Sequence, residues 1–200
     1  MCLRRIRNLF LNYHTKLKYE TLNKRYFPTK GLKTNISYTI HTDLHTNTAY
    51  SSLATQITKI FPIALNTFII PTIYGRFIFN DGIPFMYSNV IGGEGYNPHY
   101  EQQIPFSGLP HTESTLKLLG NARIQIRHKF HGKQYLTLSG NYAIHQNQFS
   151  NFLQGKKIYG TSIGYGYDSP LGPIEGFICY SNRTNKLGFY LNIGFGFKKI

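Results

Sequence analysis

Hydrophobic and polar side chains alternate along several segments of the chain. Because successive side chains of a β-strand point to opposite faces of the sheet, a period of two predicts strands with one apolar and one polar face. The alternation is clearest in residues 9–19, 32–41, 118–127, 135–144 and 188–197. Less regular apolar runs at 51–60, 66–79, 158–167 and 174–181 raise the expected number to about nine strands, joined by loops that carry Pro, Gly, Asn and Asp. The sequence therefore predicts an all-β fold.

Two all-β architectures share this pattern. A soluble sandwich turns its polar face to water, whereas a transmembrane antiparallel β-barrel turns its polar face to a hydrated lumen and its apolar face to lipid. The make-up of the two faces favours the barrel. The polar face consists of small groups, glycines and spaced Arg or Lys, and the apolar face carries large aliphatic side chains with tyrosines towards the strand ends.

The lengths of the connections also favour the barrel. Short connections are expected at residues 23–31, 61–66, 129–133 and 168–173, with longer ones between them at 42–50, 80–112 and 146–157. Short turns at one rim and long loops at the other are typical of outer-membrane barrels. The short connection SNRTNK at 181–186 breaks this alternation.

The stretch GYGYDSPLGPIEGF, residues 164–177, illustrates the prediction for one hairpin. Tyr165 and Tyr167 are expected to face lipid near an interface, while Gly164 and Gly166 face a crowded lumen or allow strong bending. A tight rim turn is expected where turn-forming residues cluster, at Asp168, Ser169, Pro170, Gly172 and Pro173. An ordinary hairpin in a soluble sheet is the alternative interpretation.

Composition and charge narrow the possible partners. The chain has 22 Lys and Arg against 8 Asp and Glu, a formal net charge of +14, which fits anionic lipid, lipopolysaccharide phosphates or nucleic acid. Because the basic residues are spread singly or in pairs, without the long blocks of a binding arm, nucleic acid is not expected as a partner. No window approaches the roughly 18 apolar residues of a transmembrane helix, and the basic N-terminus lacks the features of a signal peptide.

Candidate catalytic and cofactor sites are weak. GTSIG at residues 160–164 matches Gly-x-Ser-x-Gly, but Ser162 lies in a predicted strand with no following helix, and no His occurs after His145 to complete the order of that hydrolase fold. Gly92, Gly93 and Gly95 form a glycine-rich stretch without the helix that a phosphate cradle requires. No catalytic residue and no cofactor are therefore expected.

Metal sites are not expected either. His41, Asp43 and His45 lie in a segment rich in Thr and Asn, with no helical spacing to bring the imidazoles together, and His128 and His131 flank a short turn. Solvated loop side chains are the favoured interpretation for these histidines, and also for Glu94 and Glu101. Cys2 and Cys179 are too few for a disulfide framework or a metal cluster.

Four motifs occur in a characteristic order: TLNKRYFPTKG at 21–31, PFMYSNVIGGEGY at 84–96, YGYDSPLGPI at 165–174 and LGFYLNIGFGF at 187–197. Together they resemble the bacterial surface antigen family, the barrel shared by outer-membrane protein assembly factors and two-partner secretion transporters. The stretch IGGEGYNPHYEQQIPFSG, residues 91–108, is most similar to the version fused behind a patatin-like phospholipase in some Gram-negative bacteria.

The resemblance implies that residues 1–200 are the C-terminal half of a sixteen-strand barrel in the bacterial outer membrane, with five strands after a long loop at 81–112 that folds back into the lumen. It implies that the loop carries its tip at Gly92, Gly93, Glu94, Gly95 and Tyr96. The lumen wall would include Arg123, Gln125 and Arg127. The residues assigned by resemblance to periplasmic turns are Phe27, Pro28, Gly31, Asp168, Pro170, Gly172 and Pro173.

Two departures from the family pattern matter. The lumen loop of the family usually ends in an Arg-Gly-aromatic tip, and this chain has no such Arg; our hypothesis is that Glu94 pairs in reverse with Arg123 or Arg127. The second departure is that no soluble periplasmic repeats and no lipase domain precede the strands, which is typical of a fragment or a split gene product.

The function that the resemblance implies is non-catalytic: to anchor, translocate or insert a passenger polypeptide such as a patatin-like lipase. The expected partners are outer-membrane lipids and lipopolysaccharide, and a missing N-terminal barrel half or passenger domain. Two alternatives stay open. One is a soluble β-sandwich module that binds anionic ligands, and the other is the phospholipase itself, for which the chain lacks a nucleophile.

Overall fold

A computed structural model describes residues 10–44, 48–80, 87–94 and 103–194. Nine long strands form one antiparallel sheet in the order β1-β2-β3-β4-β8-β9-β10-β11-β12. Their bounds are β1 (Phe10–Glu20), β2 (Gly31–Asp43), β3 (Thr48–Ala64), β4 (Thr67–Ile78), β8 (Leu118–His131), β9 (Gln134–Gln146), β10 (Lys156–Ser169), β11 (Gly172–Ser181) and β12 (Lys186–Ile193). The all-β prediction is confirmed, including four strands before the long connection and five after it.

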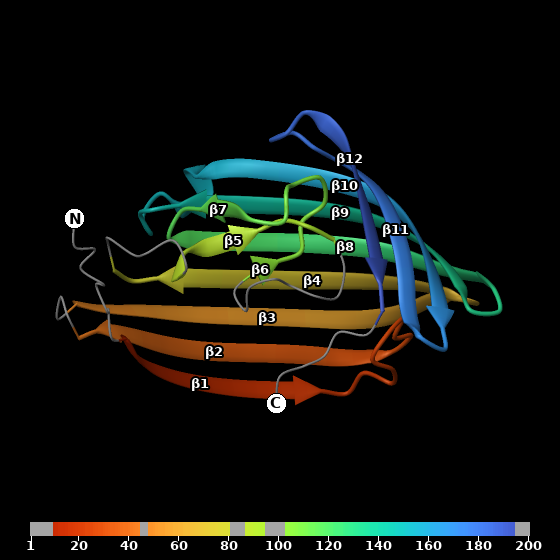
Figure 1. Cartoon of the computed structure of the whole chain (residues 1–200), viewed down its shortest axis with the longest axis horizontal. Helices are drawn as coiled ribbons and strands as arrows, with labels where there is room; N and C mark the ends of the chain where they lie inside the picture. The colour runs from red at the N-terminus through yellow and green to blue at the C-terminus, as the bar shows by residue number, and fades with distance from the viewer. Residues whose placement is uncertain (1–9, 45–47, 81–86, 95–102, 195–200) are drawn as a thin grey trace, which may run out of the picture.

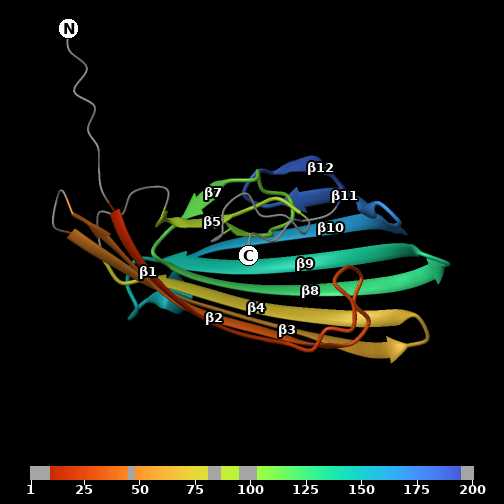
Figure 2. The same ribbon diagram turned by 60° about the horizontal axis from the view of Figure 1, so that its bottom comes forward.

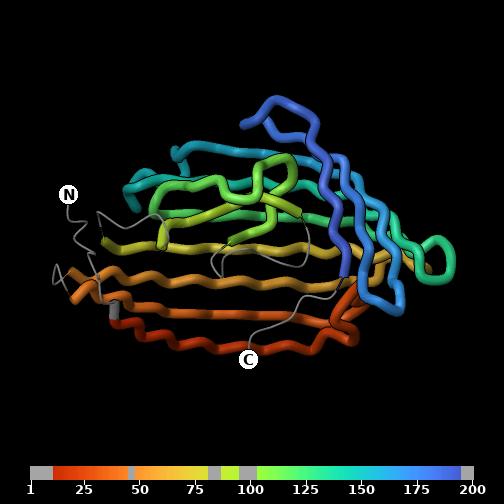
Figure 3. The backbone as a smooth tube through the Cα atoms, viewed as in Figure 1, coloured from red at the N-terminus to blue at the C-terminus, as the bar shows by residue number. Residues whose placement is uncertain are grey.

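The sheet is strongly curved (Figures 1 and 2), and it does not close, since β1 and β12 are its edges. Figure 3 shows that β11 and β12 are steeply inclined to β1–β4 and curl back over the concave side. Every neighbouring pair is antiparallel, so strand direction reverses at each step across the sheet. With nine strands in the sheet, the two edges β1 and β12 therefore run in the same direction.

A second, small sheet lies against the concave face (Figure 2). It contains β5 (Asn89–Ile91), β6 (Gln103–Ile104) and β7 (Glu113–Thr115), with β5 in the middle, parallel to β6 and antiparallel to β7. A 3-10 helix, η2 (Phe152–Gln154), lies between β9 and β10. None of the helical segments in the described ranges has the length and apolarity needed to span a bilayer.

The two faces of the large sheet differ as the alternation predicts. In β8, Arg123 and Arg127 are buried on the concave side, while Ile124 and Ile126 are exposed on the convex side. Large apolar side chains remain exposed on the convex side of all nine strands, among them Leu17, Tyr38, Ile57, Ile73, Ile126, Leu138, Ile163, Ile178 and Phe189. A water-soluble sheet would bury such a face, because exposed apolar patches of this extent mark an interaction surface.

The connections fall on two rims. At the first rim β1 connects to β2, β3 to β4, β8 to β9 and β10 to β11, and at the second rim β2 connects to β3, β4 to β8, β9 to β10 and β11 to β12. Both sets of residues predicted as periplasmic turns, around Phe27 and around Pro170, thus belong to the first rim.

One predicted loop is wrong. The connection expected at 42–50 is short, because β2 and β3 continue in register through His41↔Tyr50, Thr42↔Ala49 and Asp43↔Thr48. Threonine and tyrosine favour strands even where the apolar alternation fades near the rim. The connection expected at 61–66 is also shorter, since β3 passes through Pro62 to Ala64, with a register irregularity that accommodates the proline.

Candidate functional site: the inner segment and its anchors

Residues 87–94 and 103–117 of the long connection are called the inner segment. Its buried apolar side chains Ile91, Ile104, Phe106 and Leu109 form one cluster with wall residues Leu119, Ala143 and Ile158 of β8, β9 and β10. Burial of each large apolar side chain stabilises the docked state by about 1.5–3 kcal/mol. Apolar packing therefore holds the middle of the inner segment to the wall, and polar contacts around it fix the orientation.

Glu94 is the centre of the strongest polar contact. Its Oε2 accepts a hydrogen bond from Arg123 Nη2 at 2.5 Å, and its Oε1 accepts one from Ser162 Oγ at 3.0 Å and another from Ser107 Oγ. Ser107 Oγ also accepts a hydrogen bond from Asn141 Nδ2 at 2.6 Å. Glu94 and Arg123 are both buried, so the ion pair is little screened by solvent.

The geometry distinguishes between the two partners considered for Glu94. Arg123 makes the contact, whereas Arg127 donates from Nε to Thr137 Oγ1 at 3.2 Å and lies over the Phe27 ring. Gln125 donates to Ser139 Oγ at 3.3 Å, also on the wall. Of the predicted loop tip, Gly92, Gly93 and Glu94 are described, and Gly95 and Tyr96 lie outside the described residues.

Gly92 is required at its position for steric reasons. Its φ of +133° is a conformation that side chains rarely adopt, and an added Cβ would overlap the carbonyl oxygen of Pro110. Gly92 thus allows two backbone stretches of the inner segment to approach closely, and this steric role accounts for the glycine without a phosphate-binding loop.

Arg76 in β4 is a second anchor, one that no sequence pattern indicates. Its Nη1 donates to Asn89 Oδ1 at 2.9 Å and to the Ser88 carbonyl at 3.1 Å, and its Nη2 donates to the Tyr87 carbonyl at 3.2 Å. Asn89, fully buried, donates to the carbonyls of Leu116 and Lys117. The two ends of the inner segment, near Asn89 and near Leu116, are therefore held next to each other over β4.

A third group of contacts reaches the far edge of the sheet. Glu113 accepts hydrogen bonds from Arg183 at 2.9 and 3.1 Å, Thr184 Oγ1 donates to the Gly108 carbonyl at 3.1 Å, and Tyr190 in β12 donates to the Leu109 carbonyl. The inner segment thus spans the wall from β4 to β12.

The predicted turn residues around Phe27 do more than turn the chain. Phe27 is fully buried, stacks on Tyr135 with ring centroids 4.2 Å apart and carries the Arg127 guanidinium over its ring at 5.3 Å. An added Cβ at Gly166 would lie 2.7 Å from the Phe27 ring, which explains a glycine there in physical terms. Gly31 begins β2 at a φ of +122°.

The second predicted turn is tight. Asp168 pairs with Pro173 and Ser169 with Gly172, so that Pro170 and Leu171 form the connection between β10 and β11. The outer side chains of this hairpin, Tyr165 and Tyr167, are exposed on the convex face.

The residues weighed for catalysis or metal binding have other contacts. Ser162 belongs to the Glu94 cluster, His41 Nδ1 lies 2.7 Å from Asn12 Oδ1, and His128 Nδ1 lies 2.8 Å from Thr67 Oγ1. His45 and Glu101 lie outside the described residues. Within the described ranges, His, Cys, Asp and Glu side chains form no group of three or more that could hold a metal ion.

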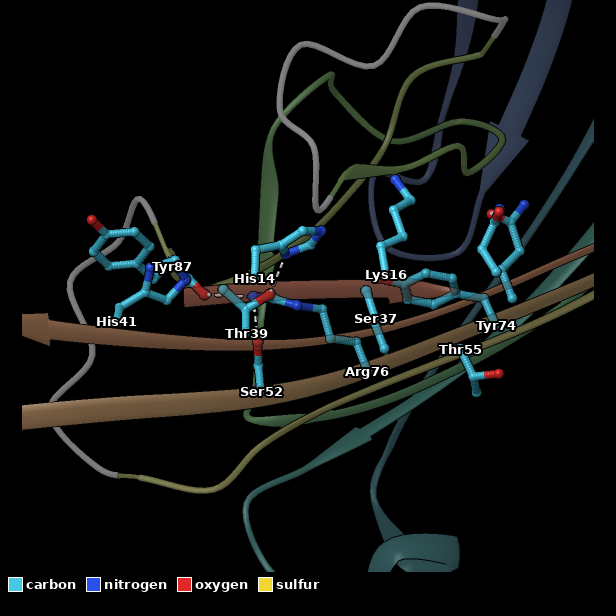
Figure 4. A pocket seen from close by; sticks show the side chains of 13 residues that line it. His14, Lys16, Ser37, Thr39, His41, Ser52, Thr55, Tyr74, Arg76 and Tyr87 are labelled. Atoms are coloured by element: carbon cyan, nitrogen blue, oxygen red, sulfur yellow. Dashed lines mark hydrogen bonds between the residues drawn. The ribbon is translucent and has the colours of Figure 1, made fainter. Parts of the chain in front are cut away.

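A hollow of about 290 Å³ opens on the concave face of β1–β4 (Figure 4). Four of its lining side chains carry or can carry positive charge: His14 and Lys16 from β1, His41 from β2 and Arg76 from β4. Hydroxyl and amide side chains make up most of the remainder, including Asn35, Ser37, Thr39, Ser52 and Gln56.

A curved antiparallel sheet, apolar outside and polar inside, with a long connection docked on the inner wall, defines the chain as part of a β-barrel of the outer-membrane type. The profile of the OMP85 superfamily matches residues 6–197, so the chain belongs to the OMP85 superfamily. Among curated proteins, no sequence matches the chain.

The fold is similar to that of BamA from Haemophilus ducreyi, in the crystal structure of a form that lacks POTRA domains 1-3, with a TM-score of 0.67 and 16% sequence identity. The match covers 92% of this chain and 42% of that chain. This chain therefore spans less than half the length of that structure, and at this identity the likeness concerns the fold.

Proposed function

We propose that the chain is the C-terminal part of a non-catalytic outer-membrane β-barrel that inserts, translocates or anchors a polypeptide. The observation that carries this proposal is the continuous apolar convex face of nine antiparallel strands in a member of the OMP85 superfamily. Such a face is stable against acyl chains and unstable in water. Outer-membrane lipids and lipopolysaccharide are the partners of this surface, and the net charge of +14 suits their phosphates.

The anchored inner segment supports a role in handling polypeptides rather than in free diffusion of solutes. Among the described residues it covers the wall from β4 to β12 and reaches β2 through the stack of Tyr87 on His41, and a hollow lies beside it on the concave face of β1–β4. A lumen with one covered and one open side suits a path along which an extended chain passes. The patatin-like phospholipase type of passenger rests on the similarity of residues 91–108 to that version of the barrel.

Strand direction restricts how the barrel can close. Because β1 and β12 run in the same direction, closure of the chain on itself, or with a second copy inserted the same way, would require a parallel strand pair. An antiparallel closure needs a complementary sheet with an odd number of strands, whether on the same polypeptide or on another. Seven further strands would complete the sixteen that the family resemblance implies. In lipid, each open edge group costs several kcal/mol, so the complement is needed for stable insertion.

Membrane fractionation tests the main proposal. The chain, exported to the outer membrane, should stay in the pellet after washing with carbonate or urea, together with the barrel portion that completes it. Arginines at Ile163 and Ile178, paired neighbours on the convex face, should release it. Arginines at Asn35 and Gln56, paired neighbours on the concave face, are the matched control and should leave it in the pellet. Release of the unmodified chain into the wash, as a folded monomer, would instead support the soluble β-sandwich.

Disulfide cross-linking tests the closure. In a chain with Cys2 and Cys179 replaced by serine, cysteines at Leu17 in β1 and Leu191 in β12 should not form a bond within one chain or between copies. A high yield of the disulfide, within one chain or between two copies, would contradict the requirement for a complementary sheet with an odd number of strands. It would leave the proposal that the chain lies in the membrane unaffected.

A further inference from the structure

The hollow on the concave face of β1–β4 has a simple structural origin. Cross-strand register places Lys16, Ser37, Ala54 and Arg76 in one row across β1, β2, β3 and β4. The two central residues are small and the two outer ones are long and cationic. The row therefore forms a floor at Ser37 and Ala54 with a positive charge at each end, as Figure 4 shows for Lys16, Ser37 and Arg76.

The next row adds donors beside this floor. His14, Thr39 and Ser52 are register neighbours in β1, β2 and β3, and His14 Nδ1 lies 2.8 Å from Thr39 Oγ1. His41, on the same face, stacks on Tyr87 with ring centroids 4.0 Å apart, and its Nδ1 lies 2.7 Å from Asn12 Oδ1. These contacts hold both imidazole rings in fixed orientations at the rim of the hollow.

The ionisable Lys, Arg and His side chains are prominent among the described lining residues of the hollow. Among its described lining residues there is no Asp or Glu, while His14, Lys16, His41 and Arg76 are all present. Arg76 is 6% exposed, and the oxygens that accept its hydrogen bonds, from Ser52, Tyr87, Ser88 and Asn89, are neutral. A buried guanidinium among neutral oxygens retains a strong attraction for an anion, because a partly buried site screens charge less than water does.

We infer that this hollow binds a small polyanion, with one phosphate or carboxylate group near Lys16 and another near Arg76. Three strand spacings separate the backbones of these two residues by about 14 Å, and their side chains extend over the floor between them. That span suits a compact molecule with two or more anionic groups. The hydroxyl groups of Ser37, Thr39 and Ser52 supply hydrogen-bond donors for the oxygens between the two ends.

Calorimetric titration of the 200-residue chain, refolded in detergent micelles together with the barrel portion that completes it, tests the inference at physiological ionic strength with two probes, pyrophosphate and citrate. Saturable binding of either probe is expected, and the probe that binds more tightly identifies phosphate or carboxylate as the preferred group. Lys16→Gln should weaken binding about tenfold, since a hydrogen bond to a charged group contributes roughly that factor. Ser37→Leu retains every charge and should abolish binding by filling the floor.

Lys59→Gln is the matched control. Lys59 lies in β3 on the opposite, convex side of the sheet, so this substitution removes the same charge without altering the hollow. It should change the affinity less than twofold. Equal weakening by Lys16→Gln and Lys59→Gln, or unchanged binding in Ser37→Leu, would show that the anions respond to net charge alone and would overturn the inference.

Chemical labelling of the unmodified chain gives a second measurement that needs no variant. Saturating pyrophosphate or citrate should slow acetylation of Lys16 several-fold relative to Lys59, as followed by mass spectrometry. Equal rates at the two lysines with and without both probes, or no saturable heat with either probe, would also overturn it.

Discussion

Replacing Glu94 with glutamine is expected to loosen the inner segment from the wall. Glutamine retains the shape of the side chain and an oxygen that accepts hydrogen bonds, but it removes the charge and leaves the Arg123 guanidinium buried without a counter-ion. In the native chain the side chain of Glu94 is 0% exposed and that of Arg123 is 10% exposed. Removal of one member of a buried ion pair costs about 3–5 kcal/mol. Because glutamine still accepts from Ser107 or Ser162, we expect the lower end, about 3 kcal/mol.

The measurement is urea unfolding of the chain refolded together with the barrel portion that completes it, followed by circular dichroism, together with protease cleavage at Lys117 in the inner segment. Glu113→Gln is the matched control, because it removes a carboxylate from the same segment. The pair that Glu113 forms with Arg183 is partly exposed, at 27% and 48% of the two side chains, and an exposed pair contributes about 0–1 kcal/mol. Glu94→Gln should therefore lower the free energy of unfolding clearly more than Glu113→Gln and should accelerate cleavage at Lys117.

A double-mutant cycle with Arg123→Gln separates the ion pair from general packing. The two substitutions should show a coupling free energy of at least about 1 kcal/mol, since the residues are in direct contact. The reasoning would be refuted if Glu94→Gln cost no more than Glu113→Gln, or if the effects at Glu94 and Arg123 were additive.

Three further substitutions test other parts of the structure by the same unfolding measurement. Gly160→Ala should cost about 1–3 kcal/mol, because its Cβ would overlap the backbone of the inner segment. The control Gly140→Ala places its Cβ more than 4 Å from any other atom and should change stability by less than about 0.5 kcal/mol. Equal effects of the two substitutions would contradict the close approach of Gly160 to the inner segment. Leu138→Arg, on the convex face, should cost about 2–4 kcal/mol in a bilayer, and no loss there would argue against lipid contact. Phe27→Ala should cost about 3 kcal/mol through the cavity beside Tyr135, and a cost below about 1 kcal/mol would mean that the stack contributes little.

Much of the large sheet was predictable because one physical rule governs it. A strand between lipid and a lumen must alternate apolar and polar side chains, and β8 follows that rule from Asn121 to Arg127. Where the rule weakens, prediction fails. Near the second rim, the sequence predicts Thr42 and Asp43 in a loop, yet they continue β2 because backbone pairing with β3 does not require an apolar face there.

The inner segment was predictable in position and not in structure. Its strands are only two or three residues long, so their geometry depends on docking against the wall rather than on local preference. Arg76 illustrates the difficulty: it lies in an irregular apolar run, and its partners Ser88 and Asn89 follow in a separate segment. Phe27 is similar, since a turn motif gives no sign that its ring reaches Tyr135.

The polarity of the Glu94 contact follows from the charge of the wall. The chain has 22 basic against 8 acidic residues, and Arg76, Arg123 and Arg127 are all buried on the concave face. An arginine at the loop tip would meet like charge there, at a cost of about 4 kcal/mol for a 4 Å separation at an effective dielectric constant of 20, whereas a carboxylate gains a similar amount. An acidic residue in the inner segment and arginines on the wall therefore depend on each other. Glu94→Arg alone should prevent docking of the inner segment. Glu94→Arg combined with Arg123→Glu should restore the protection of Lys117 from protease. If the double variant recovers no protection, packing around Phe106 and Leu109, rather than charge, determines whether the inner segment docks.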